Sequence, residues 1–522
     1  MDDEKRKEEL SGANELPGKP VSLWLATTPR PRFPKMKGDV SVDVAVLGGG
    51  ITGIAAAYHL KEAGATVAIV EARRISESVT GNTTAKITSQ HHLIYDHLIS
   101  QFGEERARIY AEAQEAAKER IAALVAEHEI ECDFQRTSAY TYTLAENELE
   151  QIEAEVDAAT KLGLPASYVE STSLPFAVKG AVKFAHQAQF HPRKYLLALV
   201  EKIPGDGSHV FEETRAFDIE DDEPCTVKTN RGIIKAKSVI IATHFPYFDP
   251  NIYFAAMSPK RSYVLGCRLR GDVPEGMYIS TGDPYRSIRN NPYDGGEMLM
   301  IGGENHKTGQ DGDTSARYRR LEEWARANFD IESIDFRWAT QDNNTLDKVP
   351  YIGKLSITSK HLYVATGFGG WGMTNSHVAA LLLTDMIMGR ENAWSELFAP
   401  SRFKPVTSAK DFVKENLNVV KEFMSDRIST PELPKPLELA QGEGAVFKSE
   451  GEHVAVYRDE QGAVHACSAV CTHMGCIVHW NSAEKSWDCP CHGSRFNYDG
   501  DVIQGPANEP LEKKQLNEQA AD

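Results

Sequence analysis

The sequence predicts an α/β protein that ends in a small all-β domain, and three observations lead to this prediction. Residues 42–71 read as a strand, a glycine-rich turn, a helix and a second strand, the unit from which parallel sheets are built. Residues 437–510 change to short strand-like runs separated by turns. The chain of 522 residues is too long for one hydrophobic core, so the two patterns belong to separate domains.

The composition is that of an ordinary folded protein, with 41% hydrophobic and 25% charged residues. The 75 acidic residues outnumber the 57 Lys and Arg residues, and the formal net charge is −18. Because an acidic surface repels phosphate backbones, nucleic acid is not an expected partner. Four of the eight cysteines lie between residues 471 and 491. This clustering indicates metal or redox chemistry rather than a disulfide-stapled secreted fold.

The N-terminal segment shows no targeting signal. Residues 1–10 are mostly charged and lack the apolar core of a signal peptide. No run of about 20 apolar residues could span a bilayer, and the most apolar run, 378–388, contains Asp385. We therefore expect a cytoplasmic protein without a membrane span. Residues 1–38 are expected to form an arm, with residues 23–25 packing on the main body.

A dinucleotide site is predicted at the glycine-rich turn 48–53. The turn follows a buried strand and opens a helix over 54–62, and Glu71 ends the next strand. In such a unit Gly48 makes the tight turn and Gly50 lets the backbone approach a pyrophosphate. Gly53 lets the helix pack closely on the strand, and Glu71 bonds the ribose hydroxyls. The motif alone does not decide between FAD and NAD.

Further elements are predicted along the chain. Helical spacing predicts amphipathic helices over 101–128 and 146–162, and buried apolar runs predict parallel strands over 237–243 and 361–366. A glycine-rich segment, 367–372, follows the last of these strands and opens a helix that reaches residue 388. Prolines between 400 and 436 indicate a linker that includes a short helical stretch over 409–424.

Several later segments resemble the D-amino-acid-oxidase-like family of FAD-dependent oxidoreductases. The matching segments are 190–195, 301–304, 347–353 and 366–374, and the resemblance spans about residues 22–395. Its gamma-glutamylputrescine oxidoreductase-like branch is the most similar. The resemblance implies a Rossmann-like FAD domain built from discontinuous segments, with an inserted β-rich substrate domain. It also implies FAD contacts after the strand 361–366, at Gly367, Gly369, Gly370, Gly372, Met373 and Thr374.

The chain departs from this family in the loop 80–86. Many members carry a Gly-Ala-Ser-Gly-like run there, and some attach FAD covalently through a histidine. No aligned histidine is present, so non-covalent FAD is expected, and His91 and His92 are interpreted as structural. Members of the family oxidise a C–H bond next to nitrogen by hydride transfer to the flavin, so no acid–base pair is required of the protein. No catalytic residue is assigned, and the candidates for lining the substrate pocket are Tyr263, Tyr285, Arg286, Arg289 and Trp371.

The second site is predicted from interleaved cysteines and histidines. Cys471 and His473 form one pair, and Cys489 and His492 form another. Two loops that each supply a thiolate and an imidazole suit a [2Fe–2S] cluster with two thiolates on one iron and two imidazoles on the other. A Cys₂His₂ zinc site is the alternative, although zinc sites usually pair Cys with Cys and His with His at short spacing.

Residues 437–510 resemble the Rieske family. The resemblance implies that Cys471 and Cys489 bind one iron and that His473 and His492 bind the other. It also implies a disulfide between Cys476 and Cys491, a pair that members acting as electron carriers have and ring-hydroxylating oxygenases lack. Gly505 and Pro506 match the loop that covers the cluster.

One position departs from the high-potential Rieske members. They carry a serine and a tyrosine that donate hydrogen bonds to the cluster sulfurs, and this chain has Ser494 but Phe496 in the tyrosine position. Because such donors stabilise the reduced form, we expect a lower potential here.

Together these features predict five segments and one function. The segments are an N-terminal arm (1–38), an FAD-dependent oxidoreductase domain (39–400), a linker (401–436), a Rieske domain (437–510) and a tail (511–522). We expect a dehydrogenase that oxidises a C–N bond of a small amine or amino acid and passes electrons singly through the cluster to an external one-electron acceptor. The alternatives are an oxidase that delivers electrons to oxygen, and a redox sensor or electron shuttle without turnover.

Overall fold

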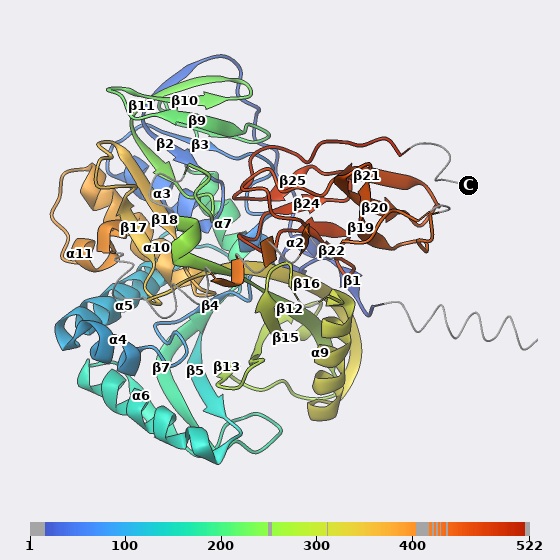
Figure 1. Ribbon diagram of the computed structural model, residues 1–522. Helices are drawn as coiled ribbons and strands as arrows, with labels where there is room; N and C mark the ends of the chain where they lie inside the picture. Colours follow the sequence, from blue (N-terminus) through green and yellow to red (C-terminus); the bar gives the residue numbers. More distant parts are fainter. Residues whose placement is uncertain are drawn as a thin grey trace, which may run out of the picture.

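The computed structural model describes residues 16–248, 253–310, 312–402, 417–419, 422–423, 426–427, 430–434 and 437–516. Three bodies make up this part of the chain, and Figure 1 shows them side by side. We call them the eight-stranded body, the ten-stranded body and the C-terminal domain (residues 437–516). The helical stretch expected over 409–424 lies mostly outside the described residues.

The eight-stranded body contains the α/β unit predicted from residues 42–71. Its strands are β2 (Val40–Leu47), β3 (Val67–Val70), β8 (His209–Phe211), β9 (Ala216–Glu220), β10 (Cys225–Thr229), β11 (Gly232–Ile241), β17 (Tyr351–Lys354) and β18 (Leu362–Thr366). β2 lies between β3 and β11, and β11 pairs with β18, all in parallel. Val44 and Val46 face one core, whereas Ala45 and Leu47 face the core on the other side of the sheet. Burial on both faces explains the unbroken apolar run of β2.

Two helices that follow the glycine-rich segments pack against each other over this sheet (Figure 1). They are α3 (Ile51–Glu62) and α10 (Gly372–Ile387), and α7 (Pro192–Val200) also contacts α3. α3 begins at Ile51, earlier than the helix expected from residue 54, because the extended backbone of Gly50 caps it and Gly53 lies inside its first turn. Gly64 follows the helix with a φ of 91°, as its role in helix termination requires.

The ten-stranded body is the β-rich insertion that the family resemblance implied. Its strands are β1 (Lys19–Pro20), β4 (Lys86–Ile87), β5 (Gln135–Thr143), β6 (Ala166–Val169), β7 (Gly180–Gln189), β12 (Met257–Leu269), β13 (Met277–Ser280), β14 (Arg286–Tyr293), β15 (Gly296–Lys307) and β16 (Ile331–Thr345). β12 runs antiparallel between β15 and β16. The strands of the ten-stranded body come from three stretches of chain, β1, β4–β7 and β12–β16, which alternate with strands of the eight-stranded body. The two bodies are therefore discontinuous in sequence.

Four longer helices flank the ten-stranded body (Figure 1): α4 (Tyr95–Phe102), α5 (Glu104–Glu127), α6 (Leu149–Lys161) and α9 (Thr314–Asn328). The helix expected over 101–128 is confirmed as α5, although residues 101 and 102 belong to the end of α4. Gly103, with a φ of 82°, ends α4 and starts α5 in a new direction. The shorter helices are α2 (Leu23–Ala26), α8 (Tyr253–Ala256), α11 (Ser395–Phe398) and the 3₁₀ turns Val79–Asn82, Glu146–Glu148 and Pro400–Arg402.

The C-terminal domain consists of two small antiparallel sheets. One contains β19 (Gly444–Ser449), β20 (Glu452–Arg458) and β21 (Val464–Ser468), and the other contains β22 (His479–Asn481), β23 (Ser486–Asp488), β24 (Arg495–Asn497) and β25 (Val502–Gln504). Turns join the strands near Gly462 and Gly500, and both glycines have a φ of 90°. The domain packs against both β-sheet bodies rather than standing apart on its linker (Figure 1), through contacts such as Arg73 with Ile503 and Gln341 with Gly493.

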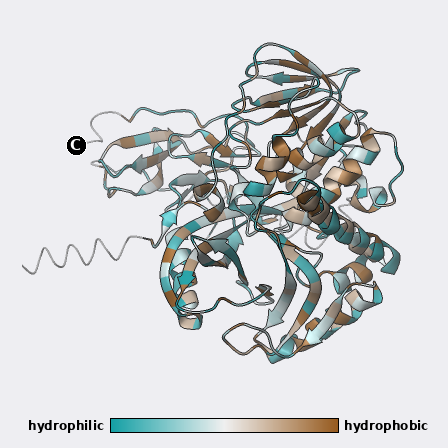
Figure 2. Cartoon of the chain, turned by 180° about the vertical axis from the view of Figure 1, so that it is seen from behind, coloured by the Kyte–Doolittle hydropathy of each residue, from teal (hydrophilic) through white to brown (hydrophobic). Residues whose placement is uncertain are grey.

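The N-terminal arm packs on the main body as predicted. Leu23 and Trp24 are buried, and the Trp24 indole donates a hydrogen bond to the carbonyl of Thr83 at 2.6 Å. In Figure 2 the apolar colour gathers on the central strands and helices, while the outer helices alternate between polar and apolar. Within the described residues, no helix combines the length and apolar character needed to cross a membrane.

Candidate functional site

A cavity of about 550 Å³ lies where the three bodies meet. Its walls include the turn after β2, the end of β3, the loops after β11 and β18, and part of β16. Because the carboxyl ends of parallel strands meet at one edge of a sheet, segments far apart in sequence converge there. Residues 502–505, 507 and 508 of the C-terminal domain complete the wall.

The glycine-rich turn forms one end of this cavity, and its geometry requires glycine. Gly48 has a φ of 110°, and a Cβ there would lie 2.5 Å from the carbonyl oxygen of Ala242. A Cβ on Gly53 would lie 1.9 Å from the carbonyl oxygen of Gly48. Gly48 and Gly50 line the cavity, whereas Gly53 lies beneath the turn and packs helix against strand. The backbone can therefore approach a ligand closely at this point.

Glu71 also lines the cavity, at the end of β3. Its carboxylate accepts hydrogen bonds from the backbone amides of Gly49 and Arg73, each at 2.8 Å. Burial raises the pKa of Glu71, and these two amides oppose that effect by stabilising the charged form. Glu71 thus connects the end of β3 to the glycine turn by hydrogen bonds, and its carboxylate lies at the edge of the cavity.

The loop after β18 forms the facing wall. Five of its six predicted residues line the cavity: Gly367, Gly369, Gly370, Gly372 and Met373. Thr374 does not, because its hydroxyl points the other way and donates to the carbonyl of Thr88 at 3.1 Å. Asp342 of β16 lines the same cavity. Burial raises its pKa to about 6, although the hydrogen bond that it receives from the backbone of Gly370 acts to lower it.

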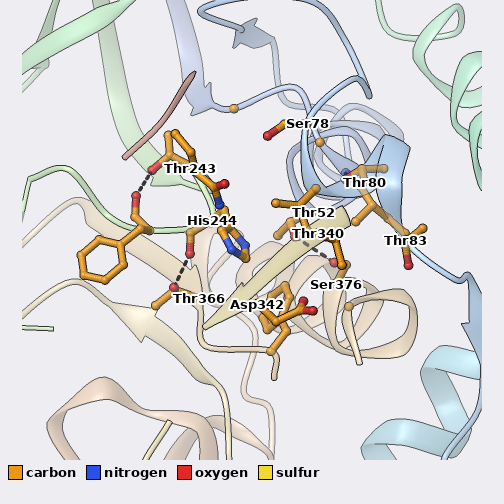
Figure 3. Close-up of a pocket in the computed structure, with 18 of the residues that line it drawn as sticks. Thr52, Ser78, Thr80, Thr83, Thr243, His244, Thr340, Asp342, Thr366 and Ser376 are labelled. Atoms are coloured by element: carbon orange, nitrogen blue, oxygen red, sulfur yellow. Dashed lines mark hydrogen bonds between the residues drawn. The ribbon is translucent and has the colours of Figure 1, made fainter. Parts of the chain in front are cut away.

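Several polar groups of the cavity wall lack a protein partner. Among the described residues, no hydrogen-bond partner exists for His244 Nε2, the Tyr247 hydroxyl or the Thr340 hydroxyl, although all three are buried. In Figure 3 His244 and Asp342 approach the cavity from one side and Thr52 and Thr80 from another. Buried polar atoms are normally satisfied, so these groups fit a polar ligand that fills the cavity. A glycine cradle, an acidic ribose partner and unsatisfied donors fit a dinucleotide such as FAD.

A second cavity of about 340 Å³ adjoins the first across residues 367–369 and Trp371. Lys260 and Lys348 line it, and no carboxylate among the described residues does. His92 lines both cavities, and its Nε2 lies 3.1 Å from the carbonyl oxygen of Ser280. The two lysines were missed in the sequence because lysines in loops and strand ends carry no distinguishing pattern.

The five residues expected to line a substrate pocket divide into two groups. Tyr285 and Trp371 line the cavities, but Tyr263, Arg286 and Arg289 do not. Tyr263 is buried against the ring of His306. The Arg286 guanidinium forms an ion pair at 2.7 Å with the buried carboxylate of Glu304, so it is not available to a ligand.

Arg289 and His91 are structural. The Arg289 guanidinium is buried beneath the first cavity and donates to backbone carbonyls, including that of Ala85 at 2.6 Å. His91 is buried too, and its Nδ1 lies 2.7 Å from the Tyr110 hydroxyl. This agrees with the structural interpretation of His91.

The second site lies in two loops of the C-terminal domain, one after β21 and one between β23 and β24. The loops are joined by a disulfide between Cys476 and Cys491, with an S–S distance of 2.10 Å. The sulfur of Cys489 lies within 4.8 Å of both disulfide sulfurs. Interaction with Cys489 lowers the pKa of Cys471 below its usual value. The bridge therefore holds the two loops, with their remaining thiols, close together.

The two histidines complete a donor set of the expected kind. The rings of His473 and His492 lie 5.1 Å apart between centroids. The Nδ1 atoms of both are buried, and neither has a hydrogen-bond partner among the described residues. Two adjacent thiols and two unsatisfied imidazole nitrogens fit a [2Fe–2S] cluster with mixed ligands.

The surroundings of this donor set include Ser494 and Phe496. The Ser494 hydroxyl contacts the Cys471 thiol and accepts a hydrogen bond from the amide of Ala507 at 3.0 Å. Phe496 is fully buried on β24 and brings no hydroxyl.

Two known families match this chain. Residues 43–386 match the family described as FAD dependent oxidoreductase, and residues 431–515 match the Rieske [2Fe-2S] domain. A putative Rieske 2Fe-2S iron-sulfur protein of Bacillus subtilis (strain 168), YhfW, is 40% identical over 499 residues, which cover 95% of this chain and 98% of that protein.

Two further similarities are more distant. Gamma-glutamylputrescine oxidoreductase of Escherichia coli (strain K12) is 24% identical and matches 68% of this chain and 86% of its own length. The crystal structure of glycine oxidase from Geobacillus kaustophilus shares the fold, with a TM-score of 0.59 and 19% identity over 70% of this chain and 100% of that chain.

Proposed function

Because the chain belongs to the FAD-dependent oxidoreductase family and ends in a Rieske [2Fe–2S] domain, we propose that it is a dehydrogenase for a small amine or amino acid. It oxidises a C–N bond of the substrate and passes electrons singly to an external one-electron acceptor. FAD supplies two-electron hydride chemistry, and the cluster supplies one-electron transfer.

The observation that carries this proposal is the shared wall of the large cavity. Residues 502–505, 507 and 508 of the Rieske domain line the same space as the glycine turn 48–50. A cluster-binding domain that forms part of a flavin site is well placed to take electrons from it. A domain with an unrelated role would not need to contribute to that wall.

The residues are proposed to act in three groups. Gly48 and Gly50, at the N-terminus of α3, hold the pyrophosphate against backbone amides, with Gly53 supporting the turn and Glu71 bonding the ribose. The loop from Gly367 to Met373 contacts the flavin ring, with Thr374 anchoring it from behind. The iron ligands are Cys471, His473, Cys489 and His492.

The charge of the second cavity favours a particular kind of substrate. Lys260 and Lys348 place positive charge on its wall, and in the described part of the chain no carboxylate lines it to bind a second ammonium group. An amino acid, with one amine and one carboxylate, suits these surroundings better than a diamine does. The relative from Escherichia coli is named for an amine substrate, which supports C–N oxidation as the reaction.

The test is an anaerobic panel of amino acids and amines, read by flavin bleaching and by the EPR signal of the reduced cluster. His492→Ala removes a proposed ligand, and Cys467→Ala changes a buried free cysteine of the same domain as the matched control. We expect a substrate to bleach the flavin in all three proteins. The cluster signal and ferricyanide-dependent turnover should be lost only in His492→Ala.

An oxidase would behave differently in this experiment. If His492→Ala kept full turnover in air and released hydrogen peroxide at one per substrate, electrons would pass from the flavin to oxygen and the cluster would be secondary. If no amine or amino acid bleached the flavin, the proposed substrate class would be wrong.

A further inference from the structure

We propose that the Rieske domain exchanges electrons with the flavin from its docked position, without swinging on its linker. We further propose that Gln341 is the positioning residue that joins the cavity to the cluster loop. This inference rests on the proposed function for the presence of both cofactors, but not on the identity of the substrate.

The docking contact is extensive and partly buried. The guanidinium of Arg261, which is 1% exposed, pairs with Glu484 of the Rieske domain. Thr314 donates a hydrogen bond to the side chain of Asn481 at 2.7 Å, and the ring of His479 lies 2.6 Å from the carbonyl oxygen of Gly309. A buried charge whose partner lies on the other domain would be left uncompensated if the domains separated. The docked arrangement is therefore strongly preferred.

Gln341 links the strand that lines the large cavity to the cluster loop. Its side-chain amide donates to the carbonyl of Gly493, the neighbour of His492, at 2.9 Å. Its neighbours Thr340 and Asp342 line the large cavity. Gln341 is 2% exposed, and there is no spare room at this contact, because a Cβ on Gly493 would lie 2.6 Å from its side-chain nitrogen.

The ring of His244 strengthens this connection from the cavity side. It lines the cavity and also interacts with the backbone of Gln341. Gln341 therefore lies between a cavity-lining side chain and the loop that carries His492.

The proposed imidazole ligands also face the flavin-binding part of the chain. The ring of Phe254 on α8 lies 4.9 Å from the ring of His492 and 6.0 Å from that of His473, both edge to face. His492 is 4% exposed. The two imidazoles that would hold the cluster thus lie against α8, whose Phe254 packs on the core of the eight-stranded body that carries the flavin site.

The electron count fixes the order of events. One substrate molecule transfers a hydride to the flavin. The hydride carries two electrons and one proton. Each transfer then oxidises the flavin by one electron and reduces one ferric iron of the cluster to ferrous iron. The external one-electron acceptor must therefore oxidise the cluster twice per substrate.

A covalent lock across the interface tests docking. The hydroxyl oxygens of Ser315 and Ser482 lie 3.0 Å apart across the domain contact. In the double variant Ser315→Cys with Ser482→Cys, oxidation should form a disulfide, counted by thiol titration in both cofactor-loaded and cofactor-free protein. The two single variants are controls. Failure of the disulfide to form in the cofactor-loaded protein would overturn the docked arrangement.

Electron transfer is then measured in locked and unlocked protein. Illumination with EDTA as the electron donor reduces bound flavin whether or not a substrate is known, and EPR follows the cluster. We expect the cluster to be reduced at the same rate in both forms, and not at all in protein stripped of FAD. If the flavin bleached but the cluster stayed oxidised in the locked form, the domain would have to move, and the proposal would be wrong.

The role of Gln341 is tested with Gln341→Leu, which keeps the volume but removes the bond to Gly493. The matched control is Thr314→Val, which removes a different hydrogen bond across the same interface. We expect Gln341→Leu to slow cluster reduction by roughly tenfold, equivalent to about 1.4 kcal/mol, with the flavin bleaching rate and the cluster potential unchanged. Thr314→Val should leave the rate unchanged. Equal slowing in both variants, or in neither, would overturn the role of Gln341.

Discussion

Single side chains tie the Rieske domain to the rest of the molecule, and His479 illustrates how. Its two ring nitrogens face two acceptors, the carbonyl oxygen of Gly309 at 2.6 Å and the carboxylate of Asp426 at 3.0 Å. Both contacts can be hydrogen bonds only when both ring nitrogens carry a proton, that is, when the imidazole is charged. Burial lowers the pKa of His479. The hydrogen bonds to Asp426 and Gly309 and the negative charges of Asp426 and Glu422 raise it by more, so the pKa lies above 6.5.

This raised pKa predicts a pH-dependent domain contact. A group whose pKa is higher in the folded state stabilises that state fully below its unfolded pKa, and the contribution is lost as pH rises through the folded pKa. Between about pH 6 and about pH 9, we expect protease cleavage near the linker to become faster. In His479→Gln the cleavage rate should not change with pH over this range. Equal pH dependence in both proteins would contradict this account.

At Phe496 a single hydroxyl is expected to change the cluster potential. The Phe496→Tyr variant places a donor in the core that surrounds the cluster cysteines. One added hydrogen bond to a cluster sulfur, at about 1 kcal/mol, should raise the potential by roughly 40 mV. The potential is measured by redox titration followed by EPR. The control is Phe447→Tyr, because Phe447 of β19 lies in a separate core. A potential that did not rise would refute the role of the missing hydroxyl.

At the scale of elements, the glycine turn between β2 and α3 shows why residue type is so restricted there. The turn must bring the start of α3 against the end of β2 while leaving its amides open to the cavity. A Cβ on Gly53 would lie 1.9 Å from a backbone oxygen, a distance that neither element can accommodate without moving. The glycine at position 53 of the sequence motif is thus required by the close packing of α3 on β2.

Gly53→Ala is therefore expected to damage the element rather than one contact. Overpacking of this kind costs about 1–3 kcal/mol in stability and should displace the turn, so FAD content should fall with the thermal midpoint. The control is Gly64→Ala, where a Cβ meets nothing within 4 Å and only the φ of 91° is unfavourable. It should lower the thermal midpoint less than Gly53→Ala does and leave the FAD content unchanged. If Gly53→Ala kept the FAD content of the unchanged protein, the turn would tolerate a side chain and this account would be wrong.

At the scale of the whole molecule, the three bodies meet at one cavity, and the Rieske domain is an integral part of its wall. The Arg261–Glu484 pair crosses this junction, and Glu484 also lies 3.1 Å from Arg495 of its own domain. Two buried arginines thus share the Glu484 carboxylate, and Arg495 pairs in addition with Asp488 at 2.9 Å. This arrangement makes the junction sensitive to the loss of that single negative charge.

Glu484→Gln is expected to loosen the junction by about 3–5 kcal/mol, the usual cost of leaving a buried charge without its partner. The measurement is urea unfolding together with the rate of protease cleavage between the domains. Glu460→Gln is the control, because Glu460 lies 3.9 Å from Lys485 in an exposed pair worth little. If the two variants unfolded alike, the pair would not hold the domains together.

The sequence by itself determined the local units and both cofactor families. The spacing of Gly48, Gly50 and Gly53 predicted the nucleotide-binding turn, and the paired Cys and His residues predicted the cluster domain. Such motifs are readable because each depends on residues close together in the chain, where backbone geometry and ligand chemistry allow few alternatives.

Only the tertiary structure decided which distant residues share a site. Tyr285 and Trp371 line the cavities whereas Arg286 and Arg289 are occupied by other partners, and Lys260 and Lys348 line the second cavity without any local signal. The contact between Gln341 and Gly493 joins residues that are far apart in sequence. A sequence pattern reports which face of an element is buried, but not what it is buried against, because that choice is made by packing among all three bodies.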